Sequence, residues 1–368
     1  MNKSKTEHYK IAIVGAGIMG RLLAWRLLCD DHKITLFDKD PVEQGDAAAF
    51  TAAGMLTPFS EIETAESLIF EMGMQSLTLW PDYIEQWQAN VGYQNTGSLI
   101  VAHGSDRADL RRFNQRLFSQ QNLKPLIQHY QCESLNAQQL QQKDPELAER
   151  FDSATFLANE AWLSPTKVMT VLAEKLQQQN IQWHSNCFIQ SLSGNKVNTS
   201  SQSYSFDKVF DCRGIGAKSD WSTLRAVRGE IIQLYAPEVS IKHLVRLMHP
   251  RYRLYLVPQP DHHYLIGATQ LETESYAAIT VRSCLELLSA AYSLHSGFAE
   301  ANLIDSRVNV RPALNDNLPK VLTKNSLIRI NGLFRHGFLL APAIAEEISY
   351  WLQHNKANKF ATLFCEDK

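Results

Sequence analysis

The first forty residues alternate apolar and polar segments in a regular order. The apolar run at 11–14 has the length of a strand, and the apolar-rich stretch at 22–28 is typical of a helix. A second apolar run at 33–37 predicts another strand. The pattern therefore predicts a strand, a helix and a second strand in close succession.

Further along the chain, apolar residues recur at helical spacing. They predict helices at 65–91, 106–121, 136–149, 166–179, 282–294 and 338–352. From residue 226 the pattern changes, and strands are predicted at 229–235, 252–258, 263–269 and 327–331. The polar stretch at 191–205 suits a surface hairpin. A β-rich layer separate from the first segment is therefore expected.

The composition favours a globular protein that binds a small molecule. The chain has 368 residues, of which 45% are hydrophobic and 20% are charged, enough to bury a large core in one or two domains. The 36 Lys and Arg residues nearly balance the 38 Asp and Glu residues. This balance gives no reason to expect nucleic acid or an anionic membrane as a partner.

Cysteine usage and the amino terminus bear on location. Six cysteines are scattered without a CxxC pair, which favours free thiols in a reducing cytosol. The polar amino terminus has no long apolar segment, so we expect a cytoplasmic protein without stable membrane insertion. The adjacent His262 and His263 lack the spacing of metal ligands and read as turn residues, so we predict no metal.

A glycine-rich turn joins the first strand to the first helix. Its residues are Gly15, Ala16, Gly17, Ile18, Met19 and Gly20. Gly15 permits a tight turn, Gly17 lets the backbone approach a pyrophosphate, and Gly20 lets the helix lie close to the strand. Together they predict a dinucleotide site, with an ordinary tight turn between strand and helix as the alternative.

An acidic residue follows the second strand, where a dinucleotide site needs one. The carboxylate of Asp38 can accept hydrogen bonds from the two hydroxyls of an adenosine ribose, which argues against a 2′-phosphate, and Lys39 is adjacent. These residues do not separate FAD from NAD.

Small residues later in the chain favour a flavin. The segment 47–58, which contains Ala53, Gly54 and Met55, lets main chain approach a flat ring closely, although a plain linker remains the alternative. A second turn at 212–217, with Gly214 and Gly216, can return to the same cofactor. It can equally be a loop chosen for its turn geometry.

Seven short sequences in order give the chain a family resemblance. They are GAGIMG at 15–20, AAGM at 52–55, VRGE at 227–230, YLVP at 255–258, IGAT at 266–269, VRP at 310–312 and RHGFLLAP at 335–342. Together they make the chain similar to the D-amino-acid oxidase superfamily, and most similar to glycine oxidases of thiazole biosynthesis. The resemblance runs from residue 11 to about residue 352.

The resemblance implies an α/β fold, α+β overall, with two domains. A discontinuous Rossmann-type FAD-binding domain would comprise 1–80, 150–225 and 312–368. A substrate domain with a mixed, largely antiparallel sheet would comprise 81–149 and 226–311.

The resemblance also implies oxidation of glycine or another small amino acid to its imine, with oxygen reduced to peroxide, in the synthesis of the thiamine thiazole. Arg311 would pair with the substrate carboxylate, Tyr255 would hydrogen-bond to it, and Arg335 would lie beside flavin and substrate. A guanidinium fork matches a carboxylate in a two-bond geometry. Read alone, Arg311 can be a strand-end salt bridge and Tyr255 a core aromatic.

The last helix completes the implied cofactor site. The resemblance places His336, Gly337, Phe338 and Leu339 beside the flavin, where a helix amino terminus stabilises negative charge. In the alternative reading, Arg335 and His336 are solvated loop residues.

Several functional alternatives remain open. Gln270 stands where glycine oxidases can carry an apolar residue, which questions strict glycine selectivity and admits sarcosine or a D-amino acid. A dehydrogenase of the same fold, a flavoprotein that modifies a partner protein and an NAD dehydrogenase are the other candidates. Family members are often homo-oligomers, and the sequence does not decide this.

Overall fold

The computed structural model describes residues 8–62, 66–120, 123–249 and 254–366. One sheet of seven strands has the order β20, β18, β19, β12, β1, β2 and β8. In chain order these strands are β1 Lys10–Val14, β2 Lys33–Phe37, β8 Gln182–His184, β12 Lys208–Asp211, β18 Lys320–Lys324, β19 Leu327–Asn331 and β20 Phe364–Glu366. All neighbours are parallel except β18 and β19. Four of the five residues in β1 and in β2 are buried, as parallel strands covered on both faces require.

Four helices share a core with this sheet. They are α1 Ile18–Leu28, α3 Ser67–Trp87, α8 Pro165–Gln178 and α10 Gly337–His354. The helix predicted at 166–179 is confirmed as α8, which starts one residue earlier because the Ser164 side chain accepts a hydrogen bond from the Lys167 backbone N–H and Pro165 suits the first turn. The strand, helix and strand expected at the beginning of the chain are also confirmed.

A second sheet of eight strands has the order β17, β13, β16, β15, β14, β4, β6 and β5. In chain order its strands are β4 Ser98–Ala102, β5 Glu133–Asn136, β6 Ser153–Leu157, β13 Arg225–Tyr235, β14 Leu244–Met248, β15 Leu254–Gln259, β16 His263–Gly267 and β17 Asn302–Ala313. Only β4 and β14 pair in parallel among these strands. The expected mixed, largely antiparallel sheet is therefore confirmed.

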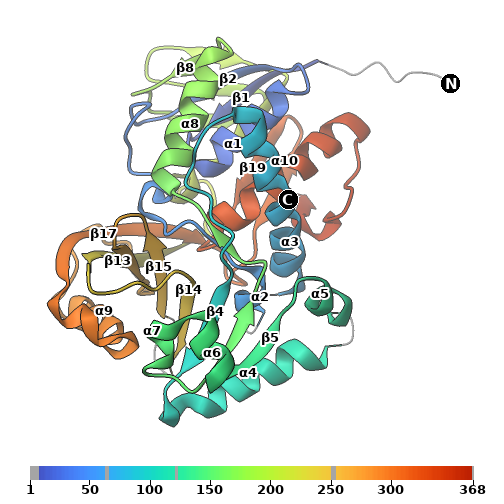
Figure 1. The fold of residues 1–368 in the computed structure, drawn as a ribbon. Helices are drawn as coiled ribbons and strands as arrows, with labels where there is room; N and C mark the ends of the chain where they lie inside the picture. The colour runs from blue at the N-terminus through green and yellow to red at the C-terminus, as the bar shows by residue number, and fades with distance from the viewer. Residues whose placement is uncertain (1–7, 63–65, 121–122, 250–253, 367–368) are drawn as a thin grey trace.

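Helices cover this second sheet through two cores. One contains residues of α6 Ala137–Lys143, α7 Pro145–Ala148 and α9 Val281–Leu294. The other contains residues of α2 Pro58–Glu61, α4 Arg107–Ser119 and α5 Lys124–His129. Figure 1 shows β1, β2, β8, α1 and α8 in the upper half of the view and the second sheet with α4, α6, α7 and α9 in the lower half.

Short elements complete the described chain. Strands β3 Met55–Leu56 and β7 Ala161–Trp162 pair with each other, and β9 Ser191–Ser193, β10 Lys196–Asn198 and β11 Ser203–Ser205 form a small sheet. The 3-10 helices are η1 Ala48–Thr51, η2 Gly104–Asp106, η3 Gly214–Ala217, η4 Ser296–Glu300 and η5 Ala361–Leu363.

Two local predictions were wrong. The helix expected at 136–149 is broken into α6 and α7, because Asp144 is extended before Pro145 and its side chain caps α7 through the Leu147 N–H. The hairpin expected at 191–205 is a three-stranded meander, since β10 pairs with both β9 and β11.

The boundaries of the two expected domains stay a prediction. Strand β6 lies in the segment 150–225 assigned to the cofactor domain, yet it pairs with β4 and β5 in the eight-stranded sheet. In the part of the chain that the structure describes, no helix is long and apolar enough to cross a membrane. All six cysteines are unpaired.

Candidate active site

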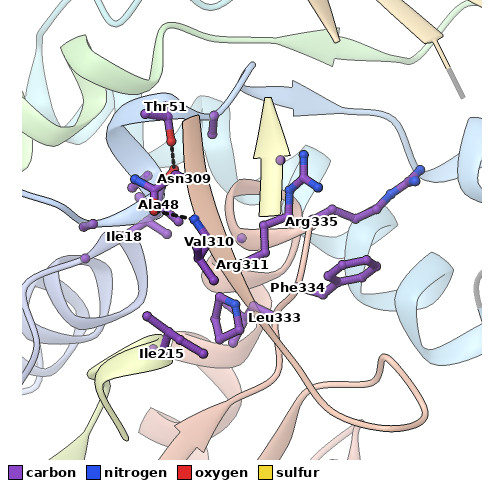
Figure 2. A pocket seen from close by; sticks show the side chains of 18 of the residues that line it. Ile18, Ala48, Thr51, Ile215, Asn309, Val310, Arg311, Leu333, Phe334 and Arg335 are labelled. Carbon is purple, nitrogen blue, oxygen red and sulfur yellow. Dashed lines mark hydrogen bonds between the residues drawn. The ribbon is translucent and has the colours of Figure 1, made fainter. Parts of the chain in front are cut away.

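A cavity of about 1400 Å³ extends from the glycine turn of α1 to the start of α10. Segments far apart in the sequence line it, and Figure 2 shows labelled side chains from the start of α1, from η1, η3 and β17 and from the turn before α10 around the same space. Nearly all of the expected site residues line this cavity. They are Gly15, Gly17, Ile18, Met19, Asp38, Lys39, Ala53, Gly54, Met55, Gly214, Gly216, Tyr255, Arg311, Arg335, His336, Gly337, Phe338 and Leu339.

The glycine turn is closely packed against main chain. Gly15 has a φ of +102°, and a Cβ there would lie 2.5 Å from the carbonyl oxygen of Cys212. Gly20 lies beneath the turn, where a Cβ would lie 1.8 Å from the carbonyl oxygen of Gly15. Only glycine fits these two positions, so the predicted roles of tight turn and close helix approach match the geometry.

Asp38 is tied to this turn. Its carboxylate accepts hydrogen bonds from the backbone N–H groups of Ala16 and of Asp40, the latter at 2.8 Å. Burial raises the pKa of Asp38, and the two backbone donors oppose that rise. Because an ionised carboxylate has about four acceptor positions, it can still receive ribose hydroxyls. Lys39 forms ion pairs with Asp40 and Asp46, at 3.0 and 3.2 Å.

Two helices begin at the cavity without a side-chain cap. Gly17 precedes α1 and has no side chain, and the side chain of His336, which precedes α10, makes no capping hydrogen bond. The first N–H groups of a helix have no intrahelical partner, so in both helices they stay available and favour negative charge. A Cβ at Gly337 would lie 3.4 Å from the Ile18 side chain, so the two helix starts are neighbours. A cofactor carrying a pyrophosphate fits this arrangement.

The small-residue segment at 47–58 folds over the cavity. Ala48–Thr51 forms η1, and the following residues form β3, which pairs with β7. Gly54 has a φ of +73°, and a Cβ there would lie 2.0 Å from the carbonyl oxygen of Leu163. The segment is thus closely packed and is not a free linker. In the second turn, Gly214 also has a positive φ, and η3 contains Gly214 and Gly216.

Arg311 is a half-buried cation that faces the cavity. One of its terminal nitrogens, Nη1, donates a hydrogen bond to the Thr269 carbonyl oxygen at 3.1 Å. Burial, with a contribution from the nearby charge of Arg335, lowers the pKa of Arg311 to about 10. A Cβ at Gly229 would lie 2.1 Å from Nη2, so the guanidinium rests on the backbone of β13.

No carboxylate of the described residues forms an ion pair with Arg311. The reading of Arg311 as a strand-end salt bridge therefore finds no partner in this part of the chain. A partly buried charge without a counter-ion loses some of its hydration, and an anionic ligand would offset that loss. Arg311 is thus suited to bind a carboxylate.

Glu61, which the sequence did not mark, joins three expected site residues. Arg335 donates to its Oε1, the Tyr255 hydroxyl donates to the same oxygen at 3.0 Å, and His336 Nε2 lies 3.3 Å from Oε2. Burial alone would raise the pKa of Glu61, but Arg335 and His336 outweigh it and hold that pKa well below its usual range. Neither Arg335 nor His336 is a solvated loop residue, since both side chains are largely buried.

These contacts fix the direction of the Tyr255 hydroxyl. The Glu61 carboxylate only accepts and Arg335 only donates, at 3.0 Å, so the hydroxyl hydrogen points to Glu61. Side chains alternate between the two faces of a strand, so Tyr255 shares a face of β15 with Val257. Val257 belongs to the core cluster on the cavity side, whereas Leu256 packs into the core on the other face. The contact of Tyr255 with a substrate carboxylate stays a prediction.

Two further residues lie at positions noted in the sequence. Gln270 lines the cavity and is exposed. His262 has a positive φ, in the turn between β15 and β16, and its Nδ1 lies 3.0 Å from the Val239 carbonyl oxygen. Nowhere in the described residues do three or more His, Cys, Asp or Glu residues gather as a metal site would require.

Comparison with known proteins assigns the chain to a family. A model of the family described as FAD dependent oxidoreductase, DAO, matches residues 10–351. A Rhizobium etli protein assigned as thiamine biosynthesis oxidoreductase ThiO is 34% identical over 344 residues, which cover 92% of this chain and 95% of that protein.

Two comparisons concern glycine oxidases. The glycine oxidase of Geobacillus kaustophilus is 24% identical over 92% of this chain and 91% of its own. A crystal structure of glycine oxidase from the same organism superposes with a TM-score of 0.83 at 22% identity, covering 98% of both chains.

The chain belongs to the FAD-dependent oxidoreductase family. The expected family and fold class are thereby confirmed, and FAD is the cofactor rather than NAD. The glycine turn, the Asp38 carboxylate and the uncapped starts of α1 and α10 fit FAD.

Proposed function

We propose that this chain oxidises glycine or another small amino acid whose carboxylate binds to Arg311. The observation that carries the proposal is the half-buried guanidinium of Arg311, which faces the cavity without a carboxylate partner among the described residues. The names of the similar proteins, glycine oxidase and a thiamine biosynthesis oxidoreductase, support this choice of substrate and a role in forming the thiamine thiazole.

The overall reaction moves two electrons and two protons from the amine to oxygen. The amine loses two electrons and two protons to become an imine, which water hydrolyses to a carbonyl compound and ammonia. Oxygen takes up the two electrons and two protons to become hydrogen peroxide. For glycine the products are glyoxylate and ammonia, unless the imine is captured first. When bound, FAD supplies the two-electron oxidation and the transfer of electrons to oxygen.

The cofactor would lie between the two helix starts and the segment at 47–58. Gly17 and the first turn of α1 would hold the pyrophosphate, and Asp38 the ribose. The amino terminus of α10 would face negative charge that develops on the flavin ring, because its first N–H groups are uncapped.

The protein's own part in the reaction is orientation. Arg311 would fix the substrate carboxylate through two parallel hydrogen bonds, and its partial burial would strengthen them. Thr269 holds Arg311 through its carbonyl, and its hydroxyl donates to Glu230 at 2.9 Å. With the carboxylate fixed, the α-carbon is presented in one orientation, which is how positioning lowers a reaction barrier.

Oxygen uptake by the purified FAD protein tests the proposal. We expect glycine to drive oxygen consumption with one peroxide formed per oxygen, and sarcosine and D-alanine serve as alternative amines of similar size. Electron transfer to a quinone dye without oxygen uptake would instead identify a dehydrogenase. Absence of oxidation with every amine would refute the amine-oxidase function and favour a flavoprotein that modifies a partner protein. A cytoplasmic site of action and assembly into a homo-oligomer are further parts of the proposal.

A further inference from the structure

The two guanidinium groups in the cavity differ in their partners. Arg311 comes from β17, and Arg335 comes from the turn between β19 and α10. Figure 2 shows both side chains extending toward the same side of the pocket. They are close enough for the charge of Arg335 to help lower the pKa of Arg311. Arg335 has the carboxylate of Glu61 as its partner, whereas Arg311 has none among the described residues.

Glu61 is held in place by more than one contact. Its side chain is 5% exposed, and it binds Arg335, Tyr255 and His336. The same nitrogen of Arg335, Nη2, also donates to the Tyr255 hydroxyl at 3.0 Å. Two partners of Glu61, Tyr255 and Arg335, lie 194 and 274 residues away from it in the sequence. The positive charge of Arg335 is therefore neutralised before any substrate enters.

We propose that Glu61 restricts this site to amines that carry a single anionic group. The inference rests on the proposed function, in which Arg311 binds the substrate carboxylate. A second anionic group that reached toward Arg335 would meet the negative charge of Glu61. To bind Arg335 it would have to displace a buried carboxylate, and separating a buried ion pair is costly. Glu61 thus acts as a specificity-determining residue through Arg335.

Two ligands of nearly equal size separate charge from shape. Succinate has two carboxylates, and succinamate has one of them replaced by a neutral amide. With the FAD-bound protein, their inhibition constants against glycine oxidation and their shifts of the flavin spectrum both report binding. We expect the wild-type protein to bind succinamate more tightly than succinate.

The variant Glu61→Gln keeps the side-chain size and an acceptor oxygen but removes the charge. Arg335 then becomes available to a second anion, and hydrogen bonds between charged groups are among the strong ones. We expect the affinity ratio of succinate to succinamate to rise by about 10-fold to 100-fold.

Two controls distinguish Glu61 from a general charge effect. Glu66→Gln removes a negative charge from an exposed residue that lines the same cavity and should leave the ratio nearly unchanged. Adding Arg335→Met to Glu61→Gln should abolish the gain, because the second anion then has no cation to bind.

The outcomes separate this inference from the proposed function. Suppose that glycine is oxidised. The proposed function then stands, but the inference fails if the wild type binds succinate more tightly than succinamate. The inference also fails if Glu61→Gln shifts the affinity ratio of succinate to succinamate no more than Glu66→Gln does. If wild type oxidises no amine and binds neither ligand, both fail. Should Glu61→Gln not fold, the wild-type preference alone decides.

Discussion

Replacing Gly229 by alanine should displace the guanidinium that binds the substrate. The added Cβ would lie 2.1 Å from Nη2, 2.2 Å from Cζ and 2.6 Å from Nη1 of Arg311, all far too close. The nearest atoms belong to the far end of a flexible side chain and not to backbone. Gly229 also lies in the regular β13 and β17 pairing, without a positive φ, so alanine fits its backbone. The fold should therefore survive while Arg311 moves.

The size of the effect follows from the bonds that Arg311 would make. A hydrogen bond to a charged group contributes about 1.5–3 kcal/mol, and the displaced fork would lose at least one such bond to the substrate carboxylate. A loss of about 3 kcal/mol corresponds to roughly 100-fold, at about 1.4 kcal/mol per factor of ten. We expect kcat/KM for glycine to fall by about 100-fold, with FAD content and Tm near those of the wild type.

The assay is steady-state glycine oxidation together with binding of acetate, a carboxylate that lacks the amine. Gly104→Ala is the matched control, because a Cβ at Gly104 meets nothing within 4 Å and lies outside the cavity. Unchanged kcat/KM and unchanged acetate affinity in a correctly folded, FAD-bound Gly229→Ala protein would refute the role assigned to Arg311.

Three further changes test separate parts of the structure. Arg311→Leu should raise KM for glycine strongly while FAD stays bound, as the visible flavin absorbance will show. A KM equal to that of the wild type would contradict carboxylate binding by Arg311. Gly20→Ala should abolish FAD retention or folding, because its Cβ would lie 1.8 Å from the Gly15 carbonyl oxygen, and a variant that keeps FAD through gel filtration would contradict this. Burial raises the pKa of Glu160 from 4.5 to about 7, so the folded state binds this proton more tightly than the unfolded chain does. The stability that results is complete below about pH 4.5 and is lost as the pH rises through 7. This amounts to roughly 3 kcal/mol at about 1.4 kcal/mol per pKa unit. Glu160→Gln should therefore flatten the dependence of Tm on pH between about 4.5 and 7. A slope equal to that of the wild type would contradict the burial effect.

The cofactor half of the site was predictable because its signal is local. The glycines at 15, 17 and 20 and the acid at 38 fall within one strand, turn, helix and strand. Gly15 and Gly20 answer a short-range steric need, and Asp38 accepts hydrogen bonds from nearby backbone. The family resemblance then extended the prediction to Arg311 and Arg335, which do line the same cavity.

The substrate half depends on contacts that no local pattern records. Glu61 is the last residue of the short helix α2, and its partners Tyr255 and Arg335 are separated from it by 194 and 274 residues. Gly229 was noted only as part of a motif, because its contact with Arg311 depends on the register of β13 against β17. That pairing sets the geometry of the site, and only the folded sheet reveals it.

Some secondary structure was missed for a related reason. The long strand β17 was not predicted, because its first half is exposed and its burial pattern does not alternate regularly. It lies at the edge of the sheet and pairs with β13 alone among the strands of the described chain. Pairing with a neighbour, rather than apolar periodicity, determines such a strand.

An anaerobic titration of the FAD-bound protein with glycine tests the central claim most directly. We predict that the visible flavin absorbance of the wild type bleaches on adding glycine and returns when air is admitted, while Arg311→Leu keeps its flavin and bleaches only at far higher glycine concentrations. If the wild-type flavin stays oxidised with glycine, sarcosine and D-alanine, or if Arg311→Leu bleaches at the same glycine concentrations as the wild type, the account is contradicted.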